Sequence, residues 1–231
     1  MDGLGVDLPA LGLAWARALP TVTIVPAFGL KAVPTPVRPA MGLALAVCIF
    51  PALAPAAHTP STASWLVAAL GEVLRGLPVA VAAAVPLWAA TIAGGLADAL
   101  RGASDTIDAP TVEGRATPFG VLLSLFACAA FLSTGGPAAV ATILAEIPAP
   151  ASFGWAATAD GIVGGIALAL AVGAPLIAAS IVIELATALV SRATTPTQIA
   201  AMVAPLRTVG ILALFALVLG RTASAIERAF P

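Results

Sequence analysis

The sequence offers few side chains that could perform metal or acid–base chemistry. It has one histidine, His58, and two cysteines, Cys48 and Cys128, among 231 residues. His58 stands in a proline-rich stretch without acidic or thiol neighbours, so the further ligands that a zinc site requires are missing around it. Each cysteine lies inside an apolar run, where a reduced thiol packs as a small hydrophobic group. We therefore expect neither a metal site nor a cofactor.

Nucleophile motifs are also absent from the sequence. It contains no Gly-x-Ser-x-Gly turn, no glycine-rich phosphate loop and no paired His or Cys spacing. An intramembrane enzyme would need a nucleophile with its base, or metal ligands, on facing helices. Because the sequence lacks such a set, we expect a protein that is not an enzyme.

A single carboxylate, Glu184, lies deep in an otherwise apolar stretch. An uncompensated carboxylate there would be costly, so a hydrogen-bonding partner is expected from a neighbouring helix or from another subunit. Arg192, two turns later on about the same helical face, is one candidate partner. A proton-linked role for Glu184 is the alternative interpretation.

Three further charges lie towards the two ends of the long apolar segment at residues 65–100. Glu72 is expected in its first turn, where a negative side chain offsets the helix dipole, with a subunit contact as the alternative role. Asp98 and Arg101, three residues apart at its other end, predict a local ion pair. Neither pattern resembles a catalytic dyad.

These isolated charges punctuate long apolar stretches. Only 9% of the residues are Asp, Glu, Lys or Arg, whereas 61% are hydrophobic, and the mean hydropathy is +1.09. A helix of about 20 residues crosses the roughly 30 Å of hydrocarbon in a bilayer. The net charge of −1 argues against a nucleic-acid surface. Four intervals without these charged residues reach the spanning length: Pro39–Gly71, Gly76–Ala97, Ala116–Ala145 and Gly161–Ile183.

The chain is therefore predicted to be an all-α, polytopic membrane protein forming one domain over residues 1–231. About six hydrophobic helical segments are expected, at residues 11–30, 40–57, 65–100, 119–147, 153–190 and 199–230. Pro78 and Pro86 predict a kinked or two-part third segment. Gly135-Gly136-Pro137 predicts that the fourth is a kinked span or a helical hairpin. The most polar stretch, residues 102–118, joins these two segments and must lie in water or in a wet cavity lined by protein.

An ordered set of short motifs runs along these segments and resembles the FliR/SctT family, the T-type subunit of the type III secretion and flagellar export gate. The resemblance covers about residues 11 to 217. The motifs are Pro26-Ala-Phe-Gly29, Val33-Pro34 with Val37-Arg38, Gly71-Glu72 with Gly76, Ala93-Gly94, Leu96-Ala-Asp98 with Gly102, Asp108-Ala-Pro110, Ala174-Pro175, Glu184, Ser191-Arg192, Pro196 and Pro205-Leu206-Arg207.

The resemblance implies a non-enzymatic, multi-pass subunit of the bacterial inner membrane. It implies assembly with R-type and S-type subunits, and with the U-type switch subunit, into a ring through which unfolded secreted proteins pass. It also implies that the loop at residues 102–118 points into the lumen and helps to plug it. The plug candidates are Gly102, Ser104, Asp105, Ile107, Asp108 and Pro110, and the candidates for subunit packing or buried polar contacts are Arg38, Glu72, Gly76, Asp98, Glu184 and Arg192.

The rival hypothesis is a small secondary transporter or permease. Broken helices at Pro78, Pro86 and residues 135–137, together with the isolated carboxylate of Glu184, are features of such proteins. Transporters of this kind often consist of two related halves. The sequence shows no internal repeat, which weakens this hypothesis.

Overall fold

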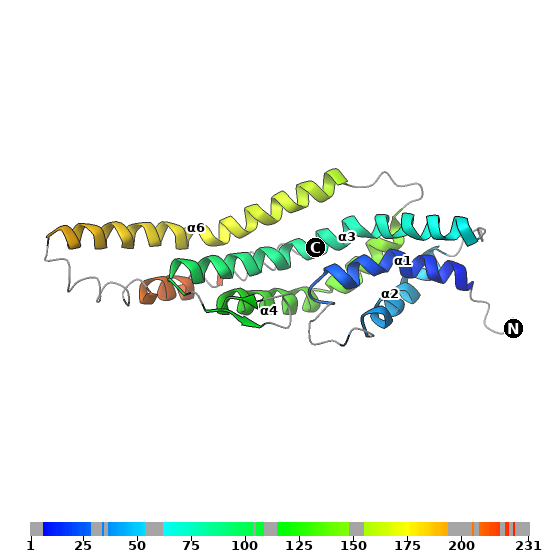
Figure 1. Cartoon of the computed structure of the whole chain (residues 1–231), viewed down its shortest axis with the longest axis horizontal. Coiled ribbons are helices and arrows are strands. Elements are labelled where there is room, and N and C mark those ends of the chain that lie inside the picture. Colours follow the sequence, from blue (N-terminus) through cyan, green and yellow to red (C-terminus); the bar gives the residue numbers. More distant parts are fainter. Residues whose placement is uncertain are drawn as a thin grey trace.

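The computed structural model describes residues 7–28, 34, 37–53, 62–103, 105–108, 115–147, 155–193, 205, 208–217, 220–221 and 224. These residues form an elongated helical bundle, so the predicted all-α class is confirmed (Figure 1). The helices are α1 (Leu8–Ile24), α2 (Val37–Leu53), α3 (Thr62–Leu100), α4 (Pro118–Ser133), α5 (Gly136–Glu146) and α6 (Trp155–Ala193), followed by a shorter apolar helix, Thr208–Leu217.

Helix α3 is the axis of the bundle. It packs against α1, α4 and α6, which lie along it in Figure 1. Its 39 residues correspond to about 58 Å of helix. The third segment was predicted to be kinked or in two parts. One uninterrupted helix runs through Pro78 and Pro86, so the two-part form is wrong, while the kink stays a prediction. Each proline removes one backbone hydrogen bond, and the neighbouring helices packed along α3 keep the segment together.

The predicted break in the fourth segment is confirmed as a sharp bend. Helices α4 and α5 meet at 64°, which is the geometry of a broken span or a re-entrant loop. Gly135 provides the left-handed turn, with φ of 81°, that few other residues adopt readily. A β-carbon at Gly136 would lie 2.3 Å from the ring of Phe131, so the chain can turn here only with glycine.

Glycines allow the helices to approach α3 closely. A β-carbon at Gly76 would lie 2.0 Å from the carbonyl oxygen of Arg17 in α1, and one at Gly94 would lie 2.2 Å from that of Phe119 in α4. A β-carbon at Gly165 of α6 would instead lie 2.0 Å from the side chain of Val85 in α3. Small residues at helix crossings permit this backbone approach in membrane bundles.

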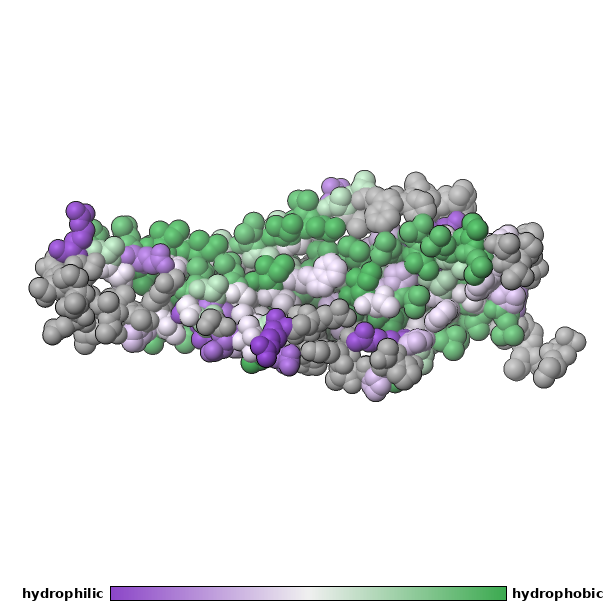
Figure 2. All heavy atoms as spheres, in the orientation of Figure 1, coloured by the Kyte–Doolittle hydropathy of each residue, from purple (hydrophilic) through white to green (hydrophobic). Residues whose placement is uncertain are grey.

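The lengths and compositions of the helices fit a membrane protein. Two helical stretches, Ser64–Leu100 and Ala159–Leu189, are long and apolar enough to cross a bilayer, and the bent α4–α5 pair would be a third. Apolar side chains cover much of the visible surface along the bundle (Figure 2). Those exposed on α6 include Ile162, Val163, Ile166, Leu170, Ile181, Val182, Leu185 and Leu189.

Candidate functional site

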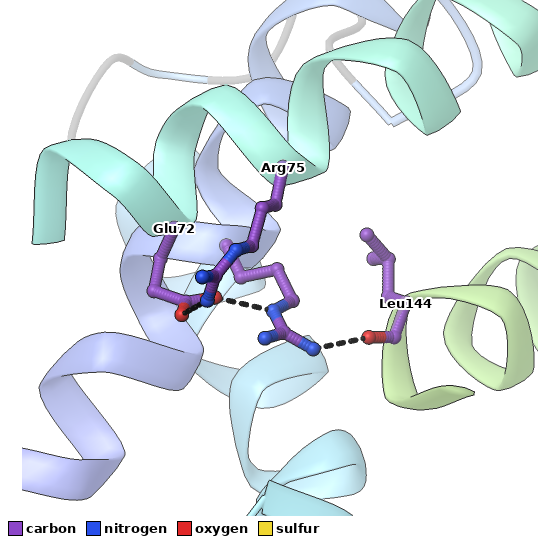
Figure 3. A network of polar contacts seen from close by, with 4 residues as sticks. Glu72, Arg75 and Leu144 are labelled. Carbon is purple, nitrogen blue, oxygen red and sulfur yellow. Dashed lines mark hydrogen bonds and ion pairs between the residues drawn. The ribbon is translucent and has the colours of Figure 1, made fainter. Parts of the chain in front are cut away.

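Two buried groups of charges lie near opposite ends of α3. The first, here the Arg17 cluster, consists of Arg17, Glu72, Arg75 and the backbone carbonyl of Leu144 (Figure 3). Arg17 Nε donates to Glu72 Oε2 at 2.6 Å, and Arg17 Nη1 donates to the Leu144 oxygen at 2.9 Å. Arg75 forms an ion pair with the other oxygen of Glu72. The cluster therefore connects α1, α3 and α5.

The burial of Arg17 explains why it needs these partners. The residue is 2% exposed, and an unpaired guanidinium at such a position would be strongly destabilising. Leu144 lies in the last turn of α5, where carbonyls have no partner within the helix and the helix dipole favours a positive charge. Arg17 thus neutralises Glu72 and also caps the end of α5.

The predicted role of Glu72 as a helix-dipole cap is wrong. Helix α3 begins at Thr62, ten residues earlier, so Glu72 lies inside the helix rather than in its first turn. Its carboxylate compensates Arg17 instead. Arg17 was not among the predicted site residues. A lone arginine amid apolar residues was itself the available signal that a carboxylate must face it.

The second group, here the loop-base cluster, lies where the 102–118 loop leaves and rejoins the helices. Asp98 Oδ1 accepts a hydrogen bond from Arg101 Nε at 2.7 Å, which confirms the predicted ion pair. Its other oxygen, Oδ2, accepts from the backbone N–H of Phe119 at 2.7 Å. Asp98 has no exposed surface, so both carboxylate oxygens are used inside the protein.

The helix Thr208–Leu217 covers this cluster. The ring of Phe215 stacks on that of Phe119 with 4.6 Å between centroids. The Arg101 guanidinium lies 5.1 Å from the centroid of the Phe119 ring on which it stacks, and the hydroxyl of Thr208 donates to the Arg101 carbonyl at 3.3 Å. The loop base therefore joins α3, α4 and the C-terminal helix.

The loop itself contains a small β-hairpin that the sequence analysis did not predict. Strands β1 (Ile107–Asp108) and β2 (Arg115–Ala116) pair antiparallel, with Ile107 opposite Ala116. Gly102 adopts φ of 77° as the chain leaves α3. Of the predicted plug residues, Gly102, Asp105, Ile107 and Asp108 are exposed, whereas Ser104 and Pro110 lie outside the described residues.

The other predicted packing residues are not gathered into one site. Arg38 is half-buried near the start of α2, and Gly76 is buried against α1. Glu184 and Arg192 are exposed on α6. Their predicted subunit contacts therefore stay predictions. Within the part of the chain that the structure describes, no three His, Cys, Asp or Glu side chains come together as metal ligands.

These features define an α-helical membrane protein with charge clusters buried between its helices. The chain belongs to the family described as bacterial export proteins, family 1, which it matches over residues 8–231. The family resemblance inferred from the motifs is thereby confirmed. The chain is also similar to the secretion system apparatus protein SsaT of Salmonella typhimurium, strain LT2, with 42% identity over 90 residues. That match covers 38% of this chain and about a third, 35%, of the relative.

Proposed function

We propose that this protein is an export-gate subunit in the bacterial inner membrane, part of a type III secretion or flagellar export apparatus. In this proposal it crosses the membrane several times and assembles with R-type, S-type and U-type subunits around a channel for unfolded secreted proteins. Membership of a bacterial export family over residues 8–231 supports the role in export. The similarity to a secretion system apparatus protein supports the type of machinery.

The observation that carries the assembly is the extent of uncovered apolar surface on α6. The stretch Ala159–Leu189 has 31 residues, or about 46 Å of helix. Its most apolar window of 18 residues has a mean hydropathy of 2.5, yet only 24% of that window is buried. Fitting that length into about 30 Å of hydrocarbon would need a tilt of about 50°, beyond the roughly 0–40° found for membrane helices. We infer that part of this apolar surface lies against other subunits.

The same helix also shows which surface faces outward. Its small residues Gly165, Ala169 and Gly173 are buried, and Gly165 and Gly173 pack against α3. The larger aliphatic residues, such as Ile166 and Leu170, are left exposed. An apolar face of this kind fits the hydrophobic helices of the R-type and S-type subunits.

The position of the hairpin supports the plug. The hairpin connects the end of α3 to the start of α4 (Figure 1). Its exposed side chains are those of Asp105, Thr106, Ile107, Asp108 and Arg115, so the described part of the loop presents mostly charged and polar groups with one aliphatic side chain. A loop of this composition suits a wet lumen better than hydrocarbon. We assign the lumen-facing role to residues 102–118.

Assembly is tested by co-purification. The tagged full chain, co-expressed with the R-type and S-type subunits, should yield a stable complex of fixed stoichiometry. Ile166→Asn with Leu170→Asn should release the partners while the chain still inserts. The matched control is Gly164→Ala, because a β-carbon at exposed Gly164 has nothing within 4 Å in the described part of the chain. A well-behaved monomer that binds a small solute and ignores those subunits would contradict the proposal and favour the transporter.

The plug is tested by shortening the loop. Replacing residues 105–114 with a short Gly-Ser linker, while keeping the loop-base cluster, should make cells expressing the complex permeable to small solutes. The control is the same complex with the full loop. Unchanged permeability, with the shortened chain still assembled, would contradict the plug role.

A further inference from the structure

We propose that Asp98 is a positioning residue for the 102–118 loop, because its one carboxylate holds both ends of the loop at once. Arg101 lies immediately before the loop and Phe119 immediately after it. The inference deepens the proposed function, since it rests on the loop being the plug, but the contacts at the base are those of this chain alone. We call this arrangement the Asp98 latch.

The strength of the latch follows from its chemistry. Both contacts are 2.7 Å long and involve a charged carboxylate with no exposed surface. Charge-assisted hydrogen bonds of this kind contribute more than neutral ones, since water does not compete for them. The carboxylate also lies at the N-terminus of α4, where the helix dipole favours a negative charge.

The capping of α4 shows that the latch is a tertiary contact replacing a local one. Thr117 occupies the N-cap position, where a threonine hydroxyl usually accepts a hydrogen bond from the first turn. It makes no capping bond, and its buried Oγ1 has no hydrogen-bond partner among the described residues. The N–H of Phe119 is bound by Asp98 of α3 instead.

Because Asp98 rather than Thr117 caps α4, the end of the loop is tied to α3. If Thr117 capped α4, the cap would be part of the loop itself, and this hydrogen bond would not hold the loop against α3. With Asp98 as the acceptor, the start of α4 cannot leave α3 without breaking the bond. Thr117 nevertheless remains available as a replacement cap, so losing Asp98 should release the loop and leave α4 folded.

Gly95 of α3 is a position at which release of the loop from α3 can be measured. A β-carbon there would lie 3.7 Å from Thr117 Oγ1, an ordinary contact that α3 tolerates. Gly95 is half-buried, and a cysteine there would lie against Thr117 at the end of the loop while the latch is closed. Cys48→Ala and Cys128→Ala remove the two natural thiols. The rate at which N-ethylmaleimide alkylates Gly95→Cys in the full chain, in host membranes, then reports how often the loop end lifts.

Asp98→Ala should raise this alkylation rate about tenfold, the change expected from losing a charge-assisted hydrogen bond. Asp98→Asn, which keeps one acceptor oxygen, should give a smaller rise and serves if the alanine variant does not accumulate. The control is Gly71→Ala, a change in α3 about 40 Å away along the helix, where a β-carbon has nothing described within 4 Å. It should leave the rate unchanged. Equal rates in the Asp98 variants and the reference, or an equal acceleration by Gly71→Ala, would overturn the latch.

A second measurement tests the replacement cap. Thr117→Val should not lower the thermal stability of the otherwise native chain, because it removes a hydroxyl that has no partner among the described residues. In the Asp98→Ala background the same change should lower it by several degrees, because α4 then loses both acceptors. Additive effects would contradict the replacement cap. Faster alkylation without solute leakage would support the latch and contradict the plug, so the two proposals fail separately.

Discussion

Removing Glu72 should test how much of the bundle depends on one buried ion pair. The Arg17 side chain is 3% exposed, that of Glu72 13% and that of Arg75 23%. In Glu72→Ala the Arg17 guanidinium stays buried, and of its two partners in the Arg17 cluster the Leu144 carbonyl remains. Breaking a buried pair in this way costs about 3–5 kcal/mol, so the free energy of unfolding should fall by about that amount.

The variants that replace the two arginines should lower the free energy of unfolding far less than Glu72→Ala does. Arg75→Ala removes an i,i+3 partner that is partly exposed, and such a pair contributes at most about 1 kcal/mol. Arg17→Met combined with Glu72→Leu removes both buried charges and should be far less harmful than Glu72→Ala alone, because apolar replacements of a buried pair are often neutral.

The assay is denaturant unfolding of the purified full chain in micelles. It compares Glu72→Ala, Arg75→Ala, the single variants Arg17→Met and Glu72→Leu, and the double variant with the unmodified chain at equal concentration. The double-mutant cycle isolates the interaction of Arg17 with Glu72 from their separate packing. If the double variant is destabilised by the sum of the two single variants, the two side chains do not act as a buried pair and the reasoning is refuted.

Three further predictions concern glycines and one isolated carboxylate. Gly76→Ala should destabilise the chain by more than about 2 kcal/mol because its β-carbon would overlap the α1 backbone, whereas Gly71→Ala, with nothing described within 4 Å, should be neutral or stabilising in the same unfolding assay. Gly165→Leu should loosen α6 from α3 and speed proteolysis of α6, and Gly164→Leu should not. Glu184→Leu should impair assembly or export while Glu184→Gln stays mild, measured as secreted cargo; equal, complete loss in both would indicate proton coupling.

The helical segments were predictable because their cause is local. Charge-free stretches longer than a bilayer crossing, separated by proline and glycine, place most of the helices within a few residues of their observed bounds. The bend between α4 and α5 was likewise predictable, since Gly135 and Gly136 provide a turn that other residues would obstruct. The start of α3 was placed three residues too late, and the role of Glu72 was wrong because Glu72 lies beyond the first turn of α3 from either start.

The charge clusters were only partly predictable because their partners are distant in sequence. Asp98 and Arg101 are three residues apart, and the helical repeat alone brings them together. Arg17 and Glu72 are 55 residues apart, and the acceptor on Leu144 is a backbone atom that no residue type announces. The bond from Phe119 to Asp98 likewise uses a backbone N–H, so side-chain chemistry could not have indicated it.

The distribution of the charges also bears on how the chain meets its surroundings. The sequence predicted that Glu184 would be a buried charge needing a hydrogen-bonding partner. In the structure the charged side chains of Arg17 and Asp98 are buried, whereas Glu184 is exposed on α6. Ile181 and Leu185 around it are exposed as well. A carboxylate facing hydrocarbon is costly, whereas one at a protein interface or near water can be hydrogen-bonded. The exposed surface around Glu184 is therefore one place on α6 where a contact with a partner subunit can be tested.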